Sequence, residues 1–183
     1  MRILERGEAG CLEHEVHSML PAMVSALGTA YVRSGRLDLG VQRLQDALDR
    51  HTYRKAGNYT FYYLLMAIAE AEAAVGHLDV AAARAEHAEH LVRLSGERAH
   101  LAQALCLRAT ILASQSAPGT EPLFLQALAG AERCAMRPLM AECHRGLARV
   151  LRPGQPDRAH EHATEANRLF AELGLDARIS AVV

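Results

Sequence analysis

The sequence is poor in aromatic side chains, which make up only 4% of its 183 residues, and it contains no tryptophan. β-Sandwiches and β-barrels need aromatic and β-branched residues to fill their pleated faces, so this shortage argues against both. Alanine and leucine supply 34 and 26 residues, about a third of the chain. Because both types lose little on entering a helix, we expect an all-α fold.

The chain also has almost no net charge. Twenty basic and 21 acidic side chains leave a formal charge of −1. No global basic field draws the chain to nucleic acid or to anionic lipid, so we expect neither as a direct partner. Nearly all the basic residues are arginines, since Lys55 is the single lysine. Together with the alanine excess, this bias indicates a GC-rich, bacterial coding sequence.

Long apolar runs and paired cysteines are absent as well. The longest wholly apolar run, residues 64–69, is far too short to cross a membrane. The four cysteines include no C-x-x-C pair and lie in stretches with helical character. We therefore expect reduced thiols and a cytoplasmic location.

The sequence repeats itself with a period of about 40 residues. The residues G-R-L-D at 35–38 recur as G-H-L-D at 76–79, and looser versions lie at 118–121 and 153–157. Glycine suits the left-handed residue that ends a helix, and the acid suits the start of the next helix. Each recurrence is therefore interpreted as the turn of a helix-turn-helix unit.

Helical periodicity around these turns places the helices. They are expected at residues 12–34, interrupted at Pro21, and at 37–50, 59–75, 79–95, 97–114, 121–136, 138–151 and 156–173. The four units lie near 12–50, 59–95, 97–136 and 138–173, in a single domain over 1–183. Alanine-lined stripes on the second helices would let neighbouring helices approach closely.

The first unit resembles a tetratricopeptide repeat. Gly28, Gly40 and Ala47 stand at the small positions of the repeat signature, Tyr31 at its aromatic position and Leu44 at its large position. The second unit keeps the small positions Ala69, Ala81 and Ala88 but has Glu72 where the aromatic would stand, and Thr52 and Arg93 replace the proline that often ends a unit. The resemblance implies a right-handed superhelical solenoid of about four repeats, with a concave groove that takes a peptide or partner protein.

The C-terminal half carries a narrower resemblance. Residues 136–148 and 169–175 are similar to the closing repeats of multidomain bacterial adenylate cyclases and LuxR-type, maltose-regulator-like activators. This implies a setting in bacterial signalling or transcriptional control. Nothing resembles a Walker P-loop, a cyclase core or a DNA-reading helix-turn-helix. Residues 1–10 look like the tail of a helix, so we expect a fragment or remnant of a longer array.

Histidine and cysteine patterns do not indicate catalysis. The pairs His14/His17, His87/His90 and His160/His162 lack the H-E-x-x-H spacing of zinc proteases, and each would need further ligands. Cys143 and His144 are adjacent, so on a helix they diverge by about 100° and do not face each other. We expect no catalytic, cofactor-binding or metal-binding residues and no enzymatic activity. A metal-dependent enzyme built on the histidine pairs is the disfavoured alternative.

Five of the eight aromatic residues lie between positions 53 and 63. On a helix, Tyr59, Tyr62, Tyr63 and Met66 would form one stripe. This stripe either packs in the core under the preceding connection or forms an adhesive edge of the groove, since tyrosine is enriched at interfaces. The sequence leaves both interpretations open.

The groove itself would be lined by the first helices of the units. The inner positions carry few bases, with Arg33 the only one nearby, and this disfavours a clamp for a C-terminal carboxylate. A mixed groove of Glu70 and Arg108, with Arg145 and Arg149 as further candidates, remains open. The partner-binding residues predicted from the sequence are Tyr59, Tyr62, Tyr63, Met66, Glu70, Arg33 and Arg108.

These features favour a non-enzymatic protein-interaction module, a scaffold or sensor. Self-association as a homodimer is a variant, because residues 179–183 are apolar and no polar capping repeat is evident. The alternative is a repeat domain that senses a sugar or another metabolite. A closed pocket lined by the tyrosines would favour the small ligand, whereas an open groove would favour a protein.

Overall fold

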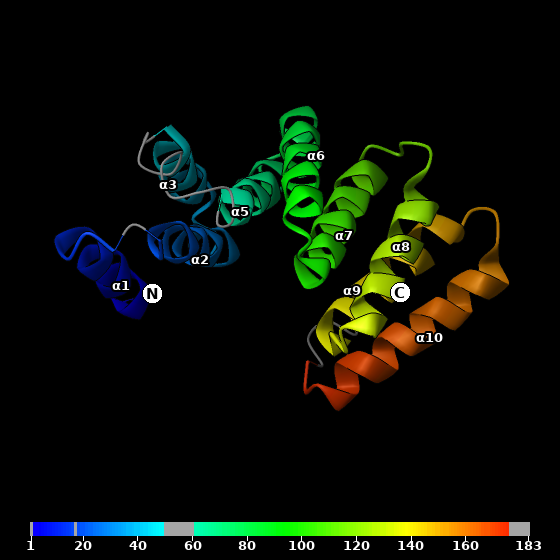
Figure 1. Cartoon of the computed structure of the whole chain (residues 1–183). Helices are drawn as coiled ribbons and strands as arrows, with labels where there is room; N and C mark the ends of the chain where they lie inside the picture. The colour runs from blue at the N-terminus through cyan, green and yellow to red at the C-terminus, as the bar shows by residue number, and fades with distance from the viewer. Residues whose placement is uncertain (1, 17, 50–60, 176–183) are drawn as a thin grey trace. The chain divides into compact units, whose positions relative to one another are not determined.

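The computed structural model describes residues 2–16, 18–49 and 61–175, and these residues are all-helical, without a strand (Figure 1). The helices are α1 (Arg2–Glu13), α2 (Leu20–Arg33), α3 (Leu37–Asp49), α5 (Phe61–Ala74), α6 (Leu78–Ser95), α7 (Arg98–Ser114), α8 (Thr120–Arg133), α9 (Arg137–Leu151) and α10 (Pro156–Glu172). The all-α prediction is confirmed.

One helix boundary was predicted wrongly. The sequence predicted a helix over 12–34, interrupted at Pro21, whereas in the structure α1 ends at Glu13 and α2 begins at Leu20. Pro21 lies in the first turn of α2, where backbone N–H groups have no acceptor within the helix, so the lack of an N–H on proline costs no hydrogen bond. The fixed φ of proline also suits the helix. The proline therefore starts a helix there.

The chain forms two compact units, Met1–Gly96 and Glu97–Val183. In the first unit, α2 pairs with α3 and α5 with α6, while α5 also contacts α2 and α3, and α1 packs on α2. In the second, α7 pairs with α8 and α9 with α10, while α9 also contacts α7 and α8. Short turns join the members of each pair, as Figure 1 shows.

A left-handed residue ends most of the helices. At Gly35, φ is 81°, and the N–H of the next residue, Arg36, donates to the carbonyl of Tyr31 over 3.0 Å. Gly76 repeats this geometry, with the His77 N–H 2.9 Å from the Glu72 carbonyl. This bond closes the last turn and satisfies a carbonyl that the helix leaves free.

The same conformation recurs at non-glycine positions, which the sequence repeat did not reveal. Positive φ values occur at Glu15, Gly35, Gly76, Gly96, Ser116, Gly119, Ala135 and Gly174. Apart from Gly119, which precedes α8, these positions lie about 20 or about 40 residues apart. The structural module is thus one helix and one turn, half of the period seen in the sequence.

The acidic residues expected at the helix starts do lie in first turns. They are Asp38, Asp79, Glu121 and Asp157. Each carboxylate lies where the exposed N–H groups of the helix favour negative charge. The N-cap positions of α6, α8 and α10 make no side-chain capping bond, so the acids act through charge in the first turn.

Glycines mark the places where paired helices approach most closely. A Cβ on Gly28 would lie 2.4 Å from Cγ of Leu44, and one on Gly40 would lie 2.7 Å from a methyl group of Val32. Leu44 is fully buried, so it has no free space into which to move. Two positions of the repeat signature are therefore glycine because α2 and α3 leave no room for a side chain.

We predict that Gly28→Ala destabilises the protein by about 1–3 kcal/mol, the usual cost of overpacking a core. The denaturant midpoint followed by circular dichroism should fall accordingly. Gly10→Ala in α1 is the matched control, because a Cβ there meets nothing within 4 Å. That control should be neutral or stabilising by up to about 1 kcal/mol. A neutral Gly28→Ala would contradict the tight crossing.

Candidate functional site

The predicted groove residues of the first unit lie on α2 and α5, which pack against each other. The guanidinium of Arg33, on α2, donates to the carboxylate of Glu70, on α5, over 3.3 Å. The two side chains are 63% and 42% exposed, so this ion pair contributes little stability, about 0–1 kcal/mol. Met66 lies one turn before Glu70 and is half-buried. The structure thus brings together three of the predicted residues.

The two described tyrosines of the aromatic cluster differ in environment. Tyr62 is 2% exposed and belongs to the core, whereas Tyr63 is half-buried. Their ring centroids are 4.6 Å apart, with an angle of 33° between the planes. Tyr62 is therefore not accessible to a partner, because its ring fills space between helices. Tyr59 lies outside the described residues.

Arg108 belongs to the other unit, on α7, and is half-buried. Nearby in the same unit, Arg149 of α9 donates to the backbone carbonyl of Thr110 over 3.3 Å. The residue set predicted from the sequence therefore divides between two units, and its members on α2 and α5 share one surface within the first unit.

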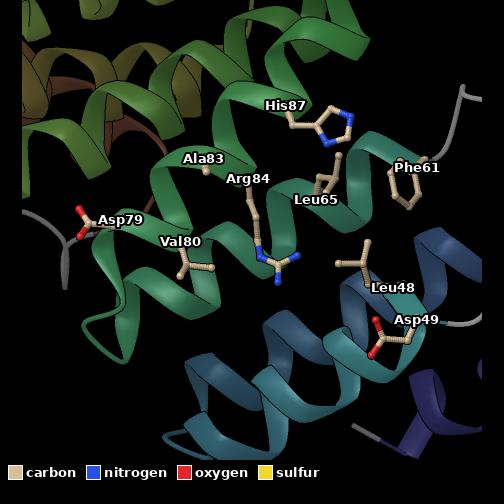
Figure 2. Close-up of a pocket in the computed structure, with 9 residues that line it drawn as sticks. All are labelled: Leu48, Asp49, Phe61, Leu65, Asp79, Val80, Ala83, Arg84 and His87. Carbon is tan, nitrogen blue, oxygen red and sulfur yellow. The ribbon is translucent and has the colours of Figure 1, made fainter.

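A pocket of about 830 Å³ lies elsewhere in the first unit, between α3, α5 and α6 (Figure 2). Its apolar wall consists of Leu48, Phe61, Leu65, Val80 and Ala83, and its polar groups are Asp49, Asp79, Arg84 and His87. Its volume lies in the range of roughly 300–1,000 Å³ that is usual for small-molecule sites, but it is a broad depression that is largely open to solvent.

Two interactions organise the pocket. Arg84 reaches from α6 toward α3, as Figure 2 shows, and donates to the side-chain oxygen of Gln45 over 2.8 Å. The rings of Phe61 and His87 meet edge to face, with centroids 6.3 Å apart and an angle of 70°. The Nε of Arg84 is buried without a hydrogen-bond partner. The pocket therefore combines an apolar wall with an arginine that is only partly satisfied.

The pocket and the predicted groove occupy opposite sides of α5. Phe61 and Leu65 are one turn apart and face the pocket, while Tyr63, Met66 and Glu70 follow the other side of the helix. Sequence reasoning missed the pocket. The sequence does show that positions 80, 83, 84 and 87 share one face of α6. This face becomes a pocket wall only because α3 packs nearby, which the sequence does not reveal.

The described residues contain no group of three or more histidine, cysteine or acidic side chains able to hold a metal ion. A histidine contact that the sequence pairs did not indicate joins His144 of α9 to His162 of α10, with their Nδ1 atoms 2.9 Å apart and ring centroids 5.1 Å apart. These residues are 18 positions apart, so no local spacing indicated the contact.

Burial lowers the pKa of both histidines. For His144 the next cause is the neighbouring His162, and for His162 it is Arg158. A hydrogen bond between two Nδ1 atoms also requires that at least one of them be unprotonated. The folded state therefore favours a pair that is not doubly charged.

Comparisons with known proteins support the fold alone. No family model matches this chain, and no curated protein matches it. Among solved structures, it is similar to the crystal structure of BtubC (BKLC) from P. vanneervenii, with a TM-score of 0.72 and 16% sequence identity. The match covers all of this chain and 84% of that chain.

Within the described residues, no helix is both long and apolar enough to span a membrane.

The histidine pair predicts a pH dependence of stability. Because the pKa values are lowered in the folded state, the unfolded chain takes up protons first as the pH falls below about 6.5. The free energy of unfolding should therefore decrease from neutral pH toward the lowered values. The charged groups near the pair are Glu165 and Arg168 beside His144, and Arg158, Glu161 and Glu121 beside His162.

Urea unfolding at about pH 7.5 and about pH 5.5 measures this effect, on either side of the ordinary histidine pKa. His162→Gln should reduce the difference between the two midpoints. His90→Gln, at an exposed position on α6, should leave the difference unchanged. An equal reduction in both variants would show that the pair has no special part in the pH dependence.

Proposed function

We propose that the protein is a non-enzymatic interaction module that binds a peptide or partner protein across α2 and α5. The observation that carries this proposal is the pairing of two half-exposed helix faces. Ala26, Thr29 and Arg33 lie on one face of α2, and the side chains at 63, 66 and 70 lie on one side of α5, which packs against α2. The Arg33–Glu70 ion pair joins the two stripes.

The chemistry of this surface suits an extended or helical segment with an apolar side. Tyr63 and Met66 are of the types enriched at protein interfaces, and Ala26 and Thr29 on α2 are small and not buried. Arg33 and Glu70 provide one donor group and one acceptor group at the same end of the surface. Such an arrangement holds a partner through its apolar anchors and orients it through the ion pair.

The wider setting rests on the resemblance to tetratricopeptide repeats. In this proposal the helix pairs form a right-handed solenoid, and the module serves as a cytoplasmic scaffold or sensor in bacterial signalling or transcriptional control. Repeat proteins commonly leave such helix faces free for partners. A second copy of the chain is one of the partners that the proposal allows.

Selection of a displayed random peptide library against the full chain tests this function. Enriched peptides should bind the purified protein, and the double variant Tyr63→Ala/Met66→Glu should weaken their binding by at least about tenfold, which corresponds to about 1.4 kcal/mol. Neither side chain is fully buried, so the variant should keep the helical spectrum of the parent protein.

Ala83→Trp is the matched control for that experiment, because Ala83 is exposed in the pocket on the other side of α5. It should leave peptide binding unchanged. Binding that survives the Tyr63/Met66 change but not the Ala83 change would reject the α2–α5 surface in favour of the pocket.

The pocket supports a second candidate function, the sensing of a small metabolite. Its volume of about 830 Å³ and its mixture of apolar wall and charged rim favour a ligand with one apolar part and one polar part. The described tyrosines do not line it. The ligand would therefore be recognised by Phe61, Arg84 and His87 rather than by the aromatic stripe.

A thermal-shift screen of sugars and other metabolites tests this candidate. A ligand at about 100 times its Kd should stabilise the folded state by about 2.7 kcal/mol, seen as a higher melting temperature. Ala83→Trp fills the pocket and should abolish the shift, while the Tyr63→Ala/Met66→Glu variant should retain it. A shift unaffected by Ala83→Trp would place the ligand elsewhere.

A further inference from the structure

Two histidine nitrogens face each other where α9 packs against α10. His144 lies on α9 and His162 on α10, and these two helices form the last helix pair in Figure 1. The Nδ1 atoms are 2.9 Å apart and the ring centroids 5.1 Å apart. The distance between centroids exceeds the distance between nitrogens by about one ring diameter, so both Nδ1 atoms lie between the two rings. Two imidazole nitrogens that converge in this way can hold a common ion.

The spacing of the nitrogens suits two bonds to one metal ion. Imidazole nitrogens bind zinc at about 2.0–2.1 Å, so two of them lie about 3.3–3.4 Å apart on a tetrahedral ion and about 2.9 Å apart when the bonds form a right angle. The observed separation of 2.9 Å lies at the lower end of this range. A tetrahedral ion would require the nitrogens to part by about 0.4–0.5 Å. The torsion that turns a histidine ring is soft, so ring rotation supplies this change without movement of either helix.

The environment keeps both nitrogens available as ligands. A metal ion binds the neutral form of imidazole, and burial lowers the pKa of both histidines, which favours that form at neutral pH. Both side chains are half-buried, so each keeps part of its surface in contact with solvent. An ion therefore reaches the pair from solvent without the opening of a core.

The charges around the pair do not oppose a cation. The groups that act electrostatically on the two imidazoles comprise three carboxylates and two guanidiniums, which are Glu121, Glu161, Glu165, Arg158 and Arg168. Each guanidinium is paired with one of these carboxylates, Arg168 with Glu165 and Arg158 with Glu121. The acids therefore exceed the bases by one, and the local balance is attractive to a positive ion.

We propose that His144 and His162 form a binding site for a divalent transition-metal ion of the class that prefers imidazole, such as Zn²⁺. The described residues offer no group of three or more histidine, cysteine or acidic side chains able to hold a metal, so water completes the coordination. Closed structural zinc sites have four protein ligands. A site with two is expected to bind its ion reversibly, and to respond to the metal concentration.

The bound ion would join the last two described helices. Each helix supplies one ligand, so the ion would link α9 to α10 in the folded state only, and binding to the folded state alone stabilises it. The inference is independent of the proposed function, because both histidines lie in the second unit, whereas the α2–α5 surface and the pocket belong to the first.

The test is a zinc titration of the full chain, with the affinity measured by competition against a chromophoric chelator. A background of Cys11→Ser and Cys134→Ser removes the two half-buried thiols, which also suit zinc. One Zn²⁺ per chain should bind at the pair, and Mg²⁺, which prefers oxygen ligands, should not compete. His144→Gln and His162→Gln should each weaken zinc binding by at least about tenfold, because each removes one of two protein ligands.

The double variant His87→Gln/His90→Gln is the matched control, because these histidines are three apart and exposed on α6. It should leave the zinc affinity unchanged. Circular dichroism establishes that each variant keeps the helical spectrum, and either glutamine variant is sufficient if the other does not fold. Hydrogen exchange gives the location independently: zinc should slow exchange of backbone amides in α9 and α10 of the parent chain, and should not do so in His162→Gln.

Three results would overturn the proposal. The first is a folded parent chain that shows no saturable zinc binding at about 1 mM, since a two-histidine chelate should bind more tightly than this. The second is zinc binding that both glutamine variants retain, which would place the ion elsewhere. The third is an equal loss of affinity in the His87/His90 control, which would show that zinc binds surface histidines without preference.

Discussion

Close packing between helices at small residues is the constraint on which the rest of the structure depends. Gly28 faces Leu44 in the first unit, and a Cβ on Gly146 would lie 2.3 Å from the Phe124 ring in the second. Where no side chain intervenes, paired helices lie close enough for alanine and glycine to fill the space between them. The shortage of aromatic residues follows from this, because few positions in such an interface have room for a ring.

Much of the fold was predictable because its determinants are local. The recurring glycine and the acid after it mark the turns at Gly35 and Gly76, and alternating small and large residues identify the buried helix faces. Ser116 and Ala135 adopt the same left-handed conformation although neither is glycine, so the residue type did not predict a turn at either position. There the hydrogen bonds of the helix ends and the packing of the following helix impose a conformation that propensity alone disfavours.

The candidate sites were less predictable, because each depends on which helices become neighbours. Periodicity placed Met66 and Glu70 together, and the pairing of Glu70 with Arg33 required α2 to pack beside α5. The same reasoning left open whether Tyr62 belongs to the core or to the binding surface, and its burial in the structure removes it from the predicted binding residues. The His144–His162 contact joins separate helices, and neither histidine carries information about its partner's position in its own local sequence.

The left-handed turns, spaced about 20 residues apart, have a consequence for how such a chain can change in length. A duplication or deletion of one helix with its turn would keep every local bond intact. In every helix pair that follows the change, the first helix would become the second helix of a pair. The buried and exposed faces of all these helices would therefore be exchanged. Only changes by an even number of modules preserve the pattern of faces. This parity rule explains why the period visible in the sequence is twice the period of the backbone.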